Sequence, residues 1–440
     1  MPQPTSCFLS TDQLVITGGR PLQGTVRIGG AKNSVLKLMA AALLTQETVT
    51  LTNVPTISDV TTMANVISHL GVTVTQDGDE LTINANKITR NEAPNELVTK
   101  MRASFNVLAP LLARCGETRV SLPGGCSIGK RGVDLHIKGL EALGAEIDIE
   151  HGMVVAKAQQ LVGADIVFDL PSVGATENVM VAAVLANGMT RIANAAQEPE
   201  IMDLADFLNA MGADITGAGT SEITIHGVPQ SALHGVRYAV MPDRIEAATY
   251  LIAGAATRGT VTVEGVRPAH LQAVLAKLTE AGCDITMPTP TALTISAPLR
   301  LEAQNITTLP YPGIPTDLQA PLMTLLATAE GSSVIKETIY ENRFNHVGQL
   351  RRMAANIEQD GNTAIVTGVE RLSGASVKAT DLRAGAAMVI AGLMADGYTT
   401  IENLHHLDRG YEGLIGKIRQ LGGTIERRMG GVDTSLAHSE

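Results

Sequence analysis

One pattern recurs six times along the 440 residues of this chain. Each copy is an amphipathic helical segment that ends at a small residue and is followed by a short strand-like run, as in HLGVTV and ALGAEI. The spacing of the copies is about seventy residues, which is typical of a repeat architecture. The small residues that mark the copies are Gly71, Gly144, Gly212, Gly282, Ala354 and Gly422, the last two in weaker copies.

A second helical segment precedes each copy and is apolar nearly all round. A helix without a wide polar face is typically buried. The strand-like runs, such as TVTLTNV and GTVTVEGV, alternate between apolar and polar residues, as expected when one face of a sheet meets water. The predicted buried helices are 34–44, 101–113, 175–186, 244–256, 317–329 and 382–395.

These patterns predict an α/β fold of two domains, a two-domain inside-out α/β barrel with buried helices and outer sheets. Each domain takes three repeats: 33–241 forms one, and 1–32 with 242–440 forms the other. The chain is then expected to cross between domains near Lys32 and Met241, and a closed domain can borrow the GTVRIGG strand from the other half. The alternative is an open solenoid of six units, which the lack of polar capping units disfavours.

Charge and composition restrict the function classes. The net charge of −11 argues against nucleic acid and anionic membranes as partners. No signal peptide and no membrane-spanning run are expected from the sequence. Four cysteines are too few for a disulfide framework, which favours a reducing, cytoplasmic location. No Cys-x-x-Cys or His-Glu-x-x-His spacing occurs, so no metal site is expected, and nothing implies an oligomer.

Several cations stand where the buried helices are expected to begin. Free N–H groups and the helix dipole make such helix starts suitable for binding anions. We therefore expect an electropositive cleft between the two domains of this acidic protein. The alternative is that each cation pairs with a local carboxylate or caps a neighbouring helix. The cations are Lys32, Lys100, Arg102, Arg244 and Arg383.

The loop 123–131 resembles a phosphate-binding loop. Gly124, Gly129 and Lys130 match the spacing G-x-x-x-x-G-K. The next residue is Arg131, where a nucleoside triphosphatase needs a serine or threonine hydroxyl for Mg²⁺. The triphosphatase interpretation is therefore rejected.

The same loop places the thiol of Cys126 near Lys130 and Arg131. Positive charge lowers the pKa of a thiol, and glycine-rich loops lie at the surface. We predict that Cys126 is reactive. The alternative, a buried structural cysteine, fits Cys115 and Cys283 better.

Ten segments spread from about residue 12 to residue 428 carry a specific resemblance. Jointly they resemble the enolpyruvyl transferase family, and within it the UDP-N-acetylglucosamine 1-carboxyvinyltransferases. The segments are GGAKN (29–33), KMRAS (100–104), LPGGCSIGKRGVDLHI (122–137), PSVGAT (171–176), NAAQEPEI (194–201), PDRIE (242–246), PTDLQA (315–320), ENRF (341–344), LSGASVKATDLRA (372–384) and HLDRGYE (406–412).

The resemblance implies the inside-out fold and an activity. Members transfer the enolpyruvyl group of phosphoenolpyruvate to the 3′-hydroxyl of UDP-N-acetylglucosamine and release phosphate, the first committed step of peptidoglycan synthesis, and need no cofactor. One alternative is the related 3-phosphoshikimate 1-carboxyvinyltransferase, which the glycine-cysteine loop and the GVDLH segment disfavour. Others are a non-catalytic nucleotide-sugar-binding paralogue and an RNA-end-processing enzyme of similar repeats.

The resemblance also implies catalytic roles. Lys32 and Asn33 bind phosphoenolpyruvate, and Arg131 and Arg409 join Lys32 in clamping its phosphate and carboxylate. Cys126 is the proton donor, which also forms a covalent adduct with phosphoenolpyruvate and is alkylated by fosfomycin.

On the acceptor side, Asp317 contacts the sugar 3′-hydroxyl as the base. Asp381, grouped with the catalytic residues, completes the cleft together with Arg343 and Arg383. Leu170 stands where some members have a lysine for the uridine phosphate. The UDP-sugar site implied by the resemblance comprises Arg102, Arg131, Gly132, Val133, Asp134, Leu135, Ser172, Val173, Gly174 and Ile339.

Overall fold

The computed structural model describes residues 12–124 and 132–429. Within them the chain forms two compact units. Unit 2 contains Ile28–Glu246 and Leu309–Pro315. Unit 1 contains the described parts of Met1–Arg27, Ala247–Thr308 and Thr316–Glu440. No helix in the described ranges has the length and apolarity that crossing a bilayer requires.

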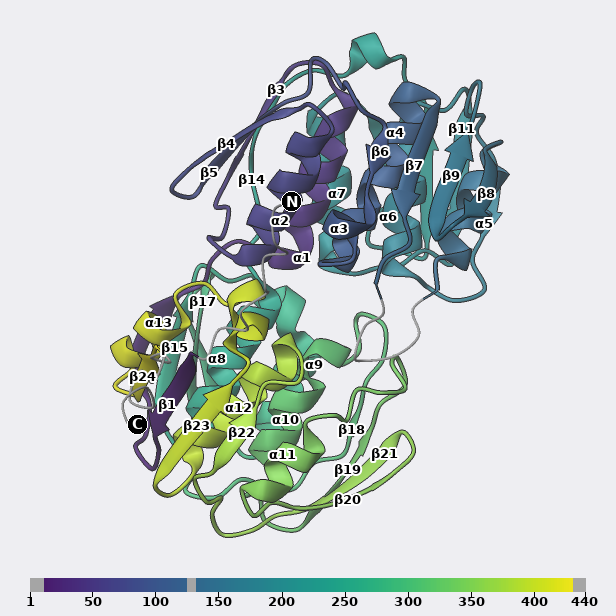
Figure 1. Ribbon diagram of the computed structural model, residues 1–440. Helices are drawn as coiled ribbons and strands as arrows, with labels where there is room; N and C mark the ends of the chain where they lie inside the picture. The colour runs from purple at the N-terminus through teal and green to yellow at the C-terminus, as the bar shows by residue number, and fades with distance from the viewer. Residues whose placement is uncertain (1–11, 125–131, 430–440) are drawn as a thin grey trace, which may run out of the picture. The chain divides into compact units, whose positions relative to one another are not determined.

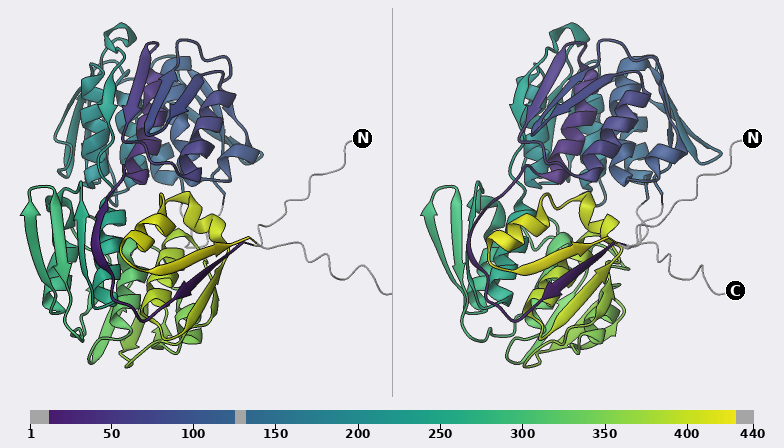
Figure 2. Two further views of the ribbon diagram at one scale, coloured as in Figure 1. Left: turned by 90° about the vertical axis from the view of Figure 1, so that its left-hand side faces the viewer. Right: turned by 60° about the vertical axis from the view of Figure 1, so that its left-hand side comes forward.

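The α/β class and the six repeats predicted from the sequence are confirmed. Over the described residues each of the first five repeats runs strand, buried helix, strand, amphipathic helix and a final antiparallel pair of strands. The sixth ends in a single strand, Thr424–Arg428, which pairs with Gln13–Thr17 from the start of the described chain. Each repeat corresponds to one four-stranded sheet, in which one edge pair is parallel and the other pairs are antiparallel. In both units the sheets lie around a group of helices (Figures 1 and 2).

Unit 2 has three sheets in its described part. Their strand orders are β14(Arg237–Ala239)-β3(Thr48–Thr52)-β5(Glu80–Asn84)-β4(Thr73–Asp77), β6(Glu92–Ala93)-β7(Glu117–Ser121)-β9(Met153–Lys157)-β8(Glu146–Glu150), and β10(Asp165–Val167)-β11(Met189–Ala193)-β13(Glu222–His226)-β12(Asp214–Thr216). The helices are α1(Lys32–Ala41), α2(Ser58–His69), α3(Asn95–Val98), α4(Leu108–Cys115), α5(Asp134–Ala142), α6(Val173–Ala183) and α7(Pro199–Ala210), with 3₁₀ segments η1(Ala42–Leu44), η2(Arg102–Val107) and η3(Gln230–Ala232).

Unit 1 repeats this plan over its described residues. Its sheets run β16(Asp284–Thr289)-β17(Ala292–Ser296)-β15(Thr260–Glu264)-β2(Gln23–Arg27), β18(Ile306–Thr307)-β19(Ser332–Lys336)-β21(Thr363–Thr367)-β20(Asn356–Asp360), and β22(Ser376–Lys378)-β23(Tyr398–Glu402)-β1(Gln13–Thr17)-β24(Thr424–Arg428). The helices are α8(Arg244–Ala256), which begins in unit 2, α9(Gln272–Glu280), α10(Gln319–Leu326), α11(Val347–Arg352), α12(Leu382–Met394) and α13(Leu414–Gln420), with η4(Pro268–Leu271), η5(Thr316–Leu318) and η6(Leu404–Arg409).

Two strands are exchanged between the first and fourth repeats. β2 precedes α1 in the chain but pairs in parallel with β15, with Val26 opposite Val263. β14 precedes α8 but pairs in parallel with β3, with Tyr238 opposite Leu51. Each strand therefore completes the sheet of the repeat that lacks one.

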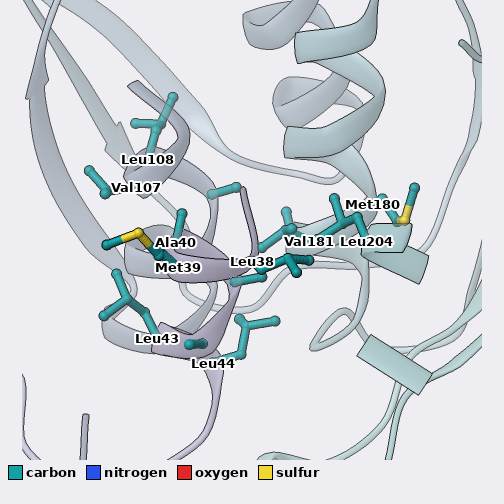
Figure 3. Close-up of a cluster of buried hydrophobic side chains, with 14 of the residues drawn as sticks. Leu38, Met39, Ala40, Leu43, Leu44, Val107, Leu108, Met180, Val181 and Leu204 are labelled. Carbon is teal, nitrogen blue, oxygen red and sulfur yellow. The ribbon is translucent and has the colours of Figure 1, made fainter. Parts of the chain in front are cut away.

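The core of unit 2 is built from the helices that the sequence predicted to be buried. Figure 3 shows Leu38 and Met39 of α1 beside Leu108 of α4, with Met180 of α6 and Leu204 of α7 in the same cluster. All five of these residues are fully buried. Small and branched aliphatic side chains let such helices pack closely.

The six residues that mark the repeats share one backbone conformation. Each follows the amphipathic helix of its repeat and has a positive φ, between 67° at Ala354 and 107° at Gly212. Glycine adopts this left-handed conformation without a steric penalty, which explains why it recurs at this position. Ala354 is the member that carries a Cβ atom.

We expect Ala354→Gly to raise the free energy of unfolding by up to about 1 kcal/mol, since a left-handed residue with a Cβ costs about 1–2 kcal/mol. Gly422→Ala, at the same position of another repeat and with no atom within 4 Å of the added Cβ, should lower it by about as much. Urea unfolding of both variants measures the effect. A shift of both variants in the same direction would contradict the explanation.

Candidate functional site

The predicted site residues fall into two groups, one in each unit. Cys126 and Arg131 lie outside the described residues. Unit 2 holds Lys32, Asn33, Arg102, Gly132, Val133, Asp134, Leu135, Ser172, Val173 and Gly174. Unit 1 holds Asp317, Ile339, Arg343, Asp381, Arg383 and Arg409.

Lys32 is the first residue of α1, and its ammonium is held by a buried carboxylate. Nζ lies 2.7 Å from Oδ2 of Asp59, which stands in the first turn of α2. The side chain of Lys32 is 11% exposed and that of Asp59 is 3% exposed. Asp59 therefore fixes the direction of the ammonium, while part of the Lys32 side chain still meets solvent.

Asp243 joins the starts of two buried helices. Its Oδ2 accepts the N–H of Lys32 at 3.1 Å. Its Oδ1 accepts the N–H groups of Ile245 and Glu246 at 2.8 and 3.0 Å, in the first turn of α8. Asp243 therefore caps the start of α8, and the same carboxylate anchors the backbone of Lys32.

Arg244 pairs with a nearby carboxylate, which is the alternative stated above for the cations at helix starts. Its guanidinium forms a buried, forked pair with Glu200, with Nε 3.0 Å from Oε1 and Nη2 3.1 Å from Oε2. It also lies over the ring of Tyr311, 5.6 Å from the centroid. Its charge is therefore neutralised inside unit 2.

The residues of unit 2 that were predicted to bind the UDP-sugar lie around the starts of α5 and α6. Nη2 of Arg102 donates to the carbonyl of Gly132 at 2.9 Å, two residues before α5 begins. Oγ of Ser172 caps α6 by accepting the N–H of Ala175 at 3.3 Å. A Cβ at Gly174 would come within 2.8 Å of the ring of His136, so only glycine allows α6 this approach to α5.

His136 is a buried histidine beside this group. Its ring meets Phe105 edge to face, with centroids 5.4 Å apart. Burial, and after it the charges of Arg102 and Lys37, lowers the pKa of His136 to about 3. The imidazole is therefore neutral at physiological pH.

We expect this histidine to make the protein less stable in mild acid. Its folded pKa lies below its unfolded value of 6.5, so the unfolded chain takes up the proton first as the pH falls. Its stabilisation is complete above pH 6.5 and decreases toward pH 3, by about 2 kcal/mol between pH 6.5 and 5. Thermal melts of wild type and His136→Gln across this range measure it, and parallel pH slopes would contradict the prediction.

Lys37 and Glu177 form a buried pair that the sequence interpretation missed. Nζ of Lys37 lies 2.8 Å from Oε1 of Glu177, and Asn106 donates to Oε2 at 3.4 Å. Burial raises the pKa of Glu177, and Lys37 opposes that rise. The predicted buried helices 34–44 and 175–186 each hold one charged residue, Lys37 and Glu177, and this is the signal that could have revealed the pair.

In unit 1, Asp317 lies in η5 between two arginines. Its Oδ1 is 2.9 Å from Nη2 of Arg343 and 3.5 Å from Nε of Arg383. The arginine side chains are 5% and 4% exposed, whereas that of Asp317 is 26% exposed. The structure thus brings together three predicted residues, with the carboxylate as the more accessible member.

Asp381 caps the helix that carries Arg383. Its Oδ1 accepts the N–H groups of Arg383 and Ala384 at 2.8 and 3.1 Å. Arg383 in turn lies over the ring of Tyr411, 5.5 Å from the centroid. The structure thus gives Asp381 a capping role at the start of α12, whereas its catalytic role stays a prediction.

The remaining predicted residues lie on turns. Arg409 ends η6. Burial, and after it the charge of His405, lowers the pKa of His406 to about 4; Asp381 opposes this lowering, and Arg409 adds a smaller one in the same direction. The N–H of Ile339 donates to Oε1 of Glu337 at 2.7 Å. Leu170 is 68% exposed. Within 12–124 and 132–429, no group of three histidine, cysteine or acidic side chains could hold a metal ion.

Comparison with known families gives consistent matches along nearly the whole chain. The sequence model described as EPSP synthase (3-phosphoshikimate 1-carboxyvinyltransferase) matches residues 16–418. UDP-N-acetylglucosamine 1-carboxyvinyltransferase 2 of Carboxydothermus hydrogenoformans is 54% identical over 94% of this chain and 99% of its own length. The UDP-N-acetylglucosamine 1-carboxyvinyltransferase of Nostoc sp. is 54% identical over 94% of this chain and 93% of its own.

Solved structures agree on the fold. The enolpyruvyl transferase NikO from Streptomyces tendae is 27% identical, with a TM-score of 0.88 over 96% of this chain and 100% of that chain. EPSP synthase from Acinetobacter baumannii is 19% identical, with a TM-score of 0.73 over 95% of this chain and 100% of that chain. At that identity the second likeness concerns the fold alone.

Proposed function

Because this chain belongs to the UDP-N-acetylglucosamine 1-carboxyvinyltransferases, within the enolpyruvyl transferase family, we propose the following reaction for it. The chain transfers the enolpyruvyl group of phosphoenolpyruvate to the 3′-hydroxyl of UDP-N-acetylglucosamine and releases phosphate. The observation that carries this is the high identity to relatives of that name over nearly the full length. For the shikimate-phosphate alternative, the family model described by that activity matches residues 16–418, whereas the solved EPSP synthase is 19% identical and shares the fold alone.

The chemistry proceeds by addition and elimination. The 3′-hydroxyl attacks C2 of phosphoenolpyruvate, C3 takes up a proton, and a tetrahedral intermediate forms. Loss of a proton from C3 and departure of phosphate from C2 then give the enolpyruvyl ether. Each well-placed acid or base contributes about 10²–10⁴-fold to such a rate.

We assign the acid and base roles to Cys126 and Asp317. Cys126 donates the proton to C3, and the carboxylate of Asp317 accepts the proton of the sugar hydroxyl. The partial exposure of Asp317 beside two buried arginines supports its part, because a base must reach its substrate. Asp381 joins the catalytic group by holding the start of the helix that carries Arg383.

The anionic donor needs cations that are already in place. We assign its phosphate and carboxylate to Lys32, Arg131 and Arg409, with Asn33 beside Lys32. The fixing of Lys32 by Asp59 and Asp243 supports this assignment, since a preorganised charge stabilises the transition state without reorganising. The UDP-sugar is assigned to the Arg102, Gly132–Leu135, Ser172–Gly174 and Ile339 groups.

A phosphate-release assay tests the function. Purified protein with phosphoenolpyruvate should release phosphate when UDP-N-acetylglucosamine is added, and not when shikimate 3-phosphate is added. Fosfomycin should block the release by alkylating Cys126. Release with shikimate 3-phosphate alone would establish the alternative, and no release with either acceptor would favour a non-catalytic paralogue.

The biological setting follows from this reaction. Its product enters peptidoglycan synthesis, so the activity contributes to cell-wall biogenesis, cell shape and cell division. The four cysteines, too few for a disulfide framework, support a cytoplasmic location for the protein.

A further inference from the structure

A buried carboxylate outside the predicted site lies at the ends of two parallel strands in unit 1. β18 and β19 pair in parallel, with Thr307 opposite Lys336. Thr308 and Glu337 follow directly, so both stand where the carboxyl ends of the strands meet the turns beyond them. Glu337 is 2% exposed, which makes its charge costly unless its oxygens are hydrogen-bonded.

Both oxygens of Glu337 accept hydrogen bonds. Oε1 accepts the hydroxyl of Thr308 at 2.8 Å and the N–H groups of Ile339 and Tyr340 at 2.7 and 3.2 Å. Oε2 accepts the hydroxyl of Thr316 at 2.9 Å. One carboxylate therefore holds the end of β18, the turn after β19 and the segment that begins η5.

The first of these partners is itself held in place. The hydroxyl of Thr308, which donates to Glu337, also accepts the N–H of Thr338 at 2.9 Å. The hydroxyl of Thr338 donates to the carbonyl of Thr308. Thr308 and Thr338 thus hold each other through two hydrogen bonds, so the hydroxyl that Glu337 accepts has a fixed position.

Two of the hydrogen-bond partners of Glu337 are close in sequence to the cluster of Asp317, Arg343 and Arg383. Thr316 is the neighbour of Asp317, and Tyr340 begins the turn that carries Arg343. Arg343 returns to Asp317 at 2.9 Å and lies over the ring of Tyr340, 5.7 Å from its centroid. Glu337, Asp317 and Arg343 are thus linked in a closed ring of contacts.

We propose that Glu337 is a positioning residue, which fixes Asp317 and Arg343 relative to each other and holds the Ile339 turn beside them. This inference rests on the proposed function, in which Asp317 is the base and Ile339 contacts the UDP-sugar. Glu337 is not a catalytic residue, because it acts through the turns it binds. A misplacement of about 1 Å in a catalytic group can cost about 10²-fold in rate, so loss of this anchor should reach the chemistry.

The test compares two replacements of Glu337. Glu337→Ala removes all four hydrogen bonds. We expect kcat for phosphate release to fall about 10–100-fold, and the KM of the variant for the UDP-sugar to be higher than that of wild type. Glu337→Gln keeps Oε1 for its three donors, and the Thr316 hydroxyl can rotate to accept from the new amide. We expect Glu337→Gln to retain kcat within about fivefold of wild type.

Ser333→Ala is the matched control. Ser333 is a buried residue of β19, and its hydroxyl accepts the N–H of Gln304 at 3.0 Å, so the variant also removes a buried hydrogen bond between this strand and the segment before β18. We expect it to lower the melting temperature while leaving kcat and KM unchanged. An equal loss of activity in Ser333→Ala and Glu337→Ala would assign Glu337 a structural role only and overturn the inference, as would a Glu337→Ala variant with wild-type kinetics.

Amide hydrogen exchange separates this inference from the proposed function. In Glu337→Ala we expect faster exchange in the segment 316–318 and in the turn 341–346, which carry Asp317 and Arg343. If wild type releases no phosphate, the proposed function fails, and this exchange still decides whether Glu337 positions the cluster. Unchanged exchange in both segments would overturn the inference even in an active enzyme.

Discussion

Asp317→Asn is expected to reduce phosphate release from phosphoenolpyruvate and UDP-N-acetylglucosamine by about 10²–10⁴-fold, because an amide cannot accept the proton of the sugar hydroxyl. The asparagine oxygen can still accept from Arg343, which lies 2.9 Å from Oδ1 in the native protein. We therefore expect the fold and the binding of the UDP-sugar to persist. Steady-state assays and calorimetric titration with UDP-N-acetylglucosamine measure the two effects separately.

Asp396→Asn provides the control for Asp317→Asn. Asp396 also pairs with an arginine, Arg371 at 3.2 Å, but both side chains are more than half exposed. An exposed ion pair contributes little to stability, so this variant should behave as wild type. If Asp317→Asn kept more than a tenth of wild-type activity, another group would have to be the base.

Lys32→Met is expected to lower both activity and stability. The activity should fall at least about 10²-fold, since the proposed clamp on the donor phosphate loses a preorganised cation. The free energy of unfolding should fall by about 3–5 kcal/mol, because Asp59 stays buried without the ammonium that lies 2.7 Å away. Phosphate release and urea unfolding of the same preparation measure the two losses.

A double variant separates the two roles of Lys32. Asp59→Asn in the Lys32→Met background removes the buried charge, and we expect it to restore most of the lost unfolding free energy. Phosphate release should stay as low as in Lys32→Met. Recovery of activity together with stability would show that Lys32 acts only on the fold and would remove it from the proposed clamp.

The architecture could be predicted because its signals are local. The small residue after each amphipathic helix repeats for a backbone reason, and the positive φ at Gly71, Gly144 and their counterparts supplies it. The apolar helices such as α12 could be recognised as buried because no face of them is polar. The division of the chain at 33–241 stays a prediction, and the structure describes two compact units with their own limits.

The sequence could predict which residues belong to the candidate site, but not which of them form ion pairs with one another. Asp317, Arg343 and Arg383 were identified by the resemblance, and the structure brings them into one cluster. The sequence offered Arg244 as a further anion-binding cation, and its buried pairing with Glu200 removes it from that set. Which carboxylate faces which cation depends on contacts between distant segments, about which a local pattern carries no information.

The sequence by itself determined the repeat, the class of fold, the burial of the helices and the family, because each depends on residue type and spacing along the chain. Only the tertiary structure decided that β2 and β14 change places between repeats, that Glu337 ties Thr316 to the turn of Ile339, and that His136 is held neutral. The physical reason is that strand pairing, hydrogen-bond partners and desolvation are properties of neighbours in space, and those neighbours come from parts of the chain far apart in sequence.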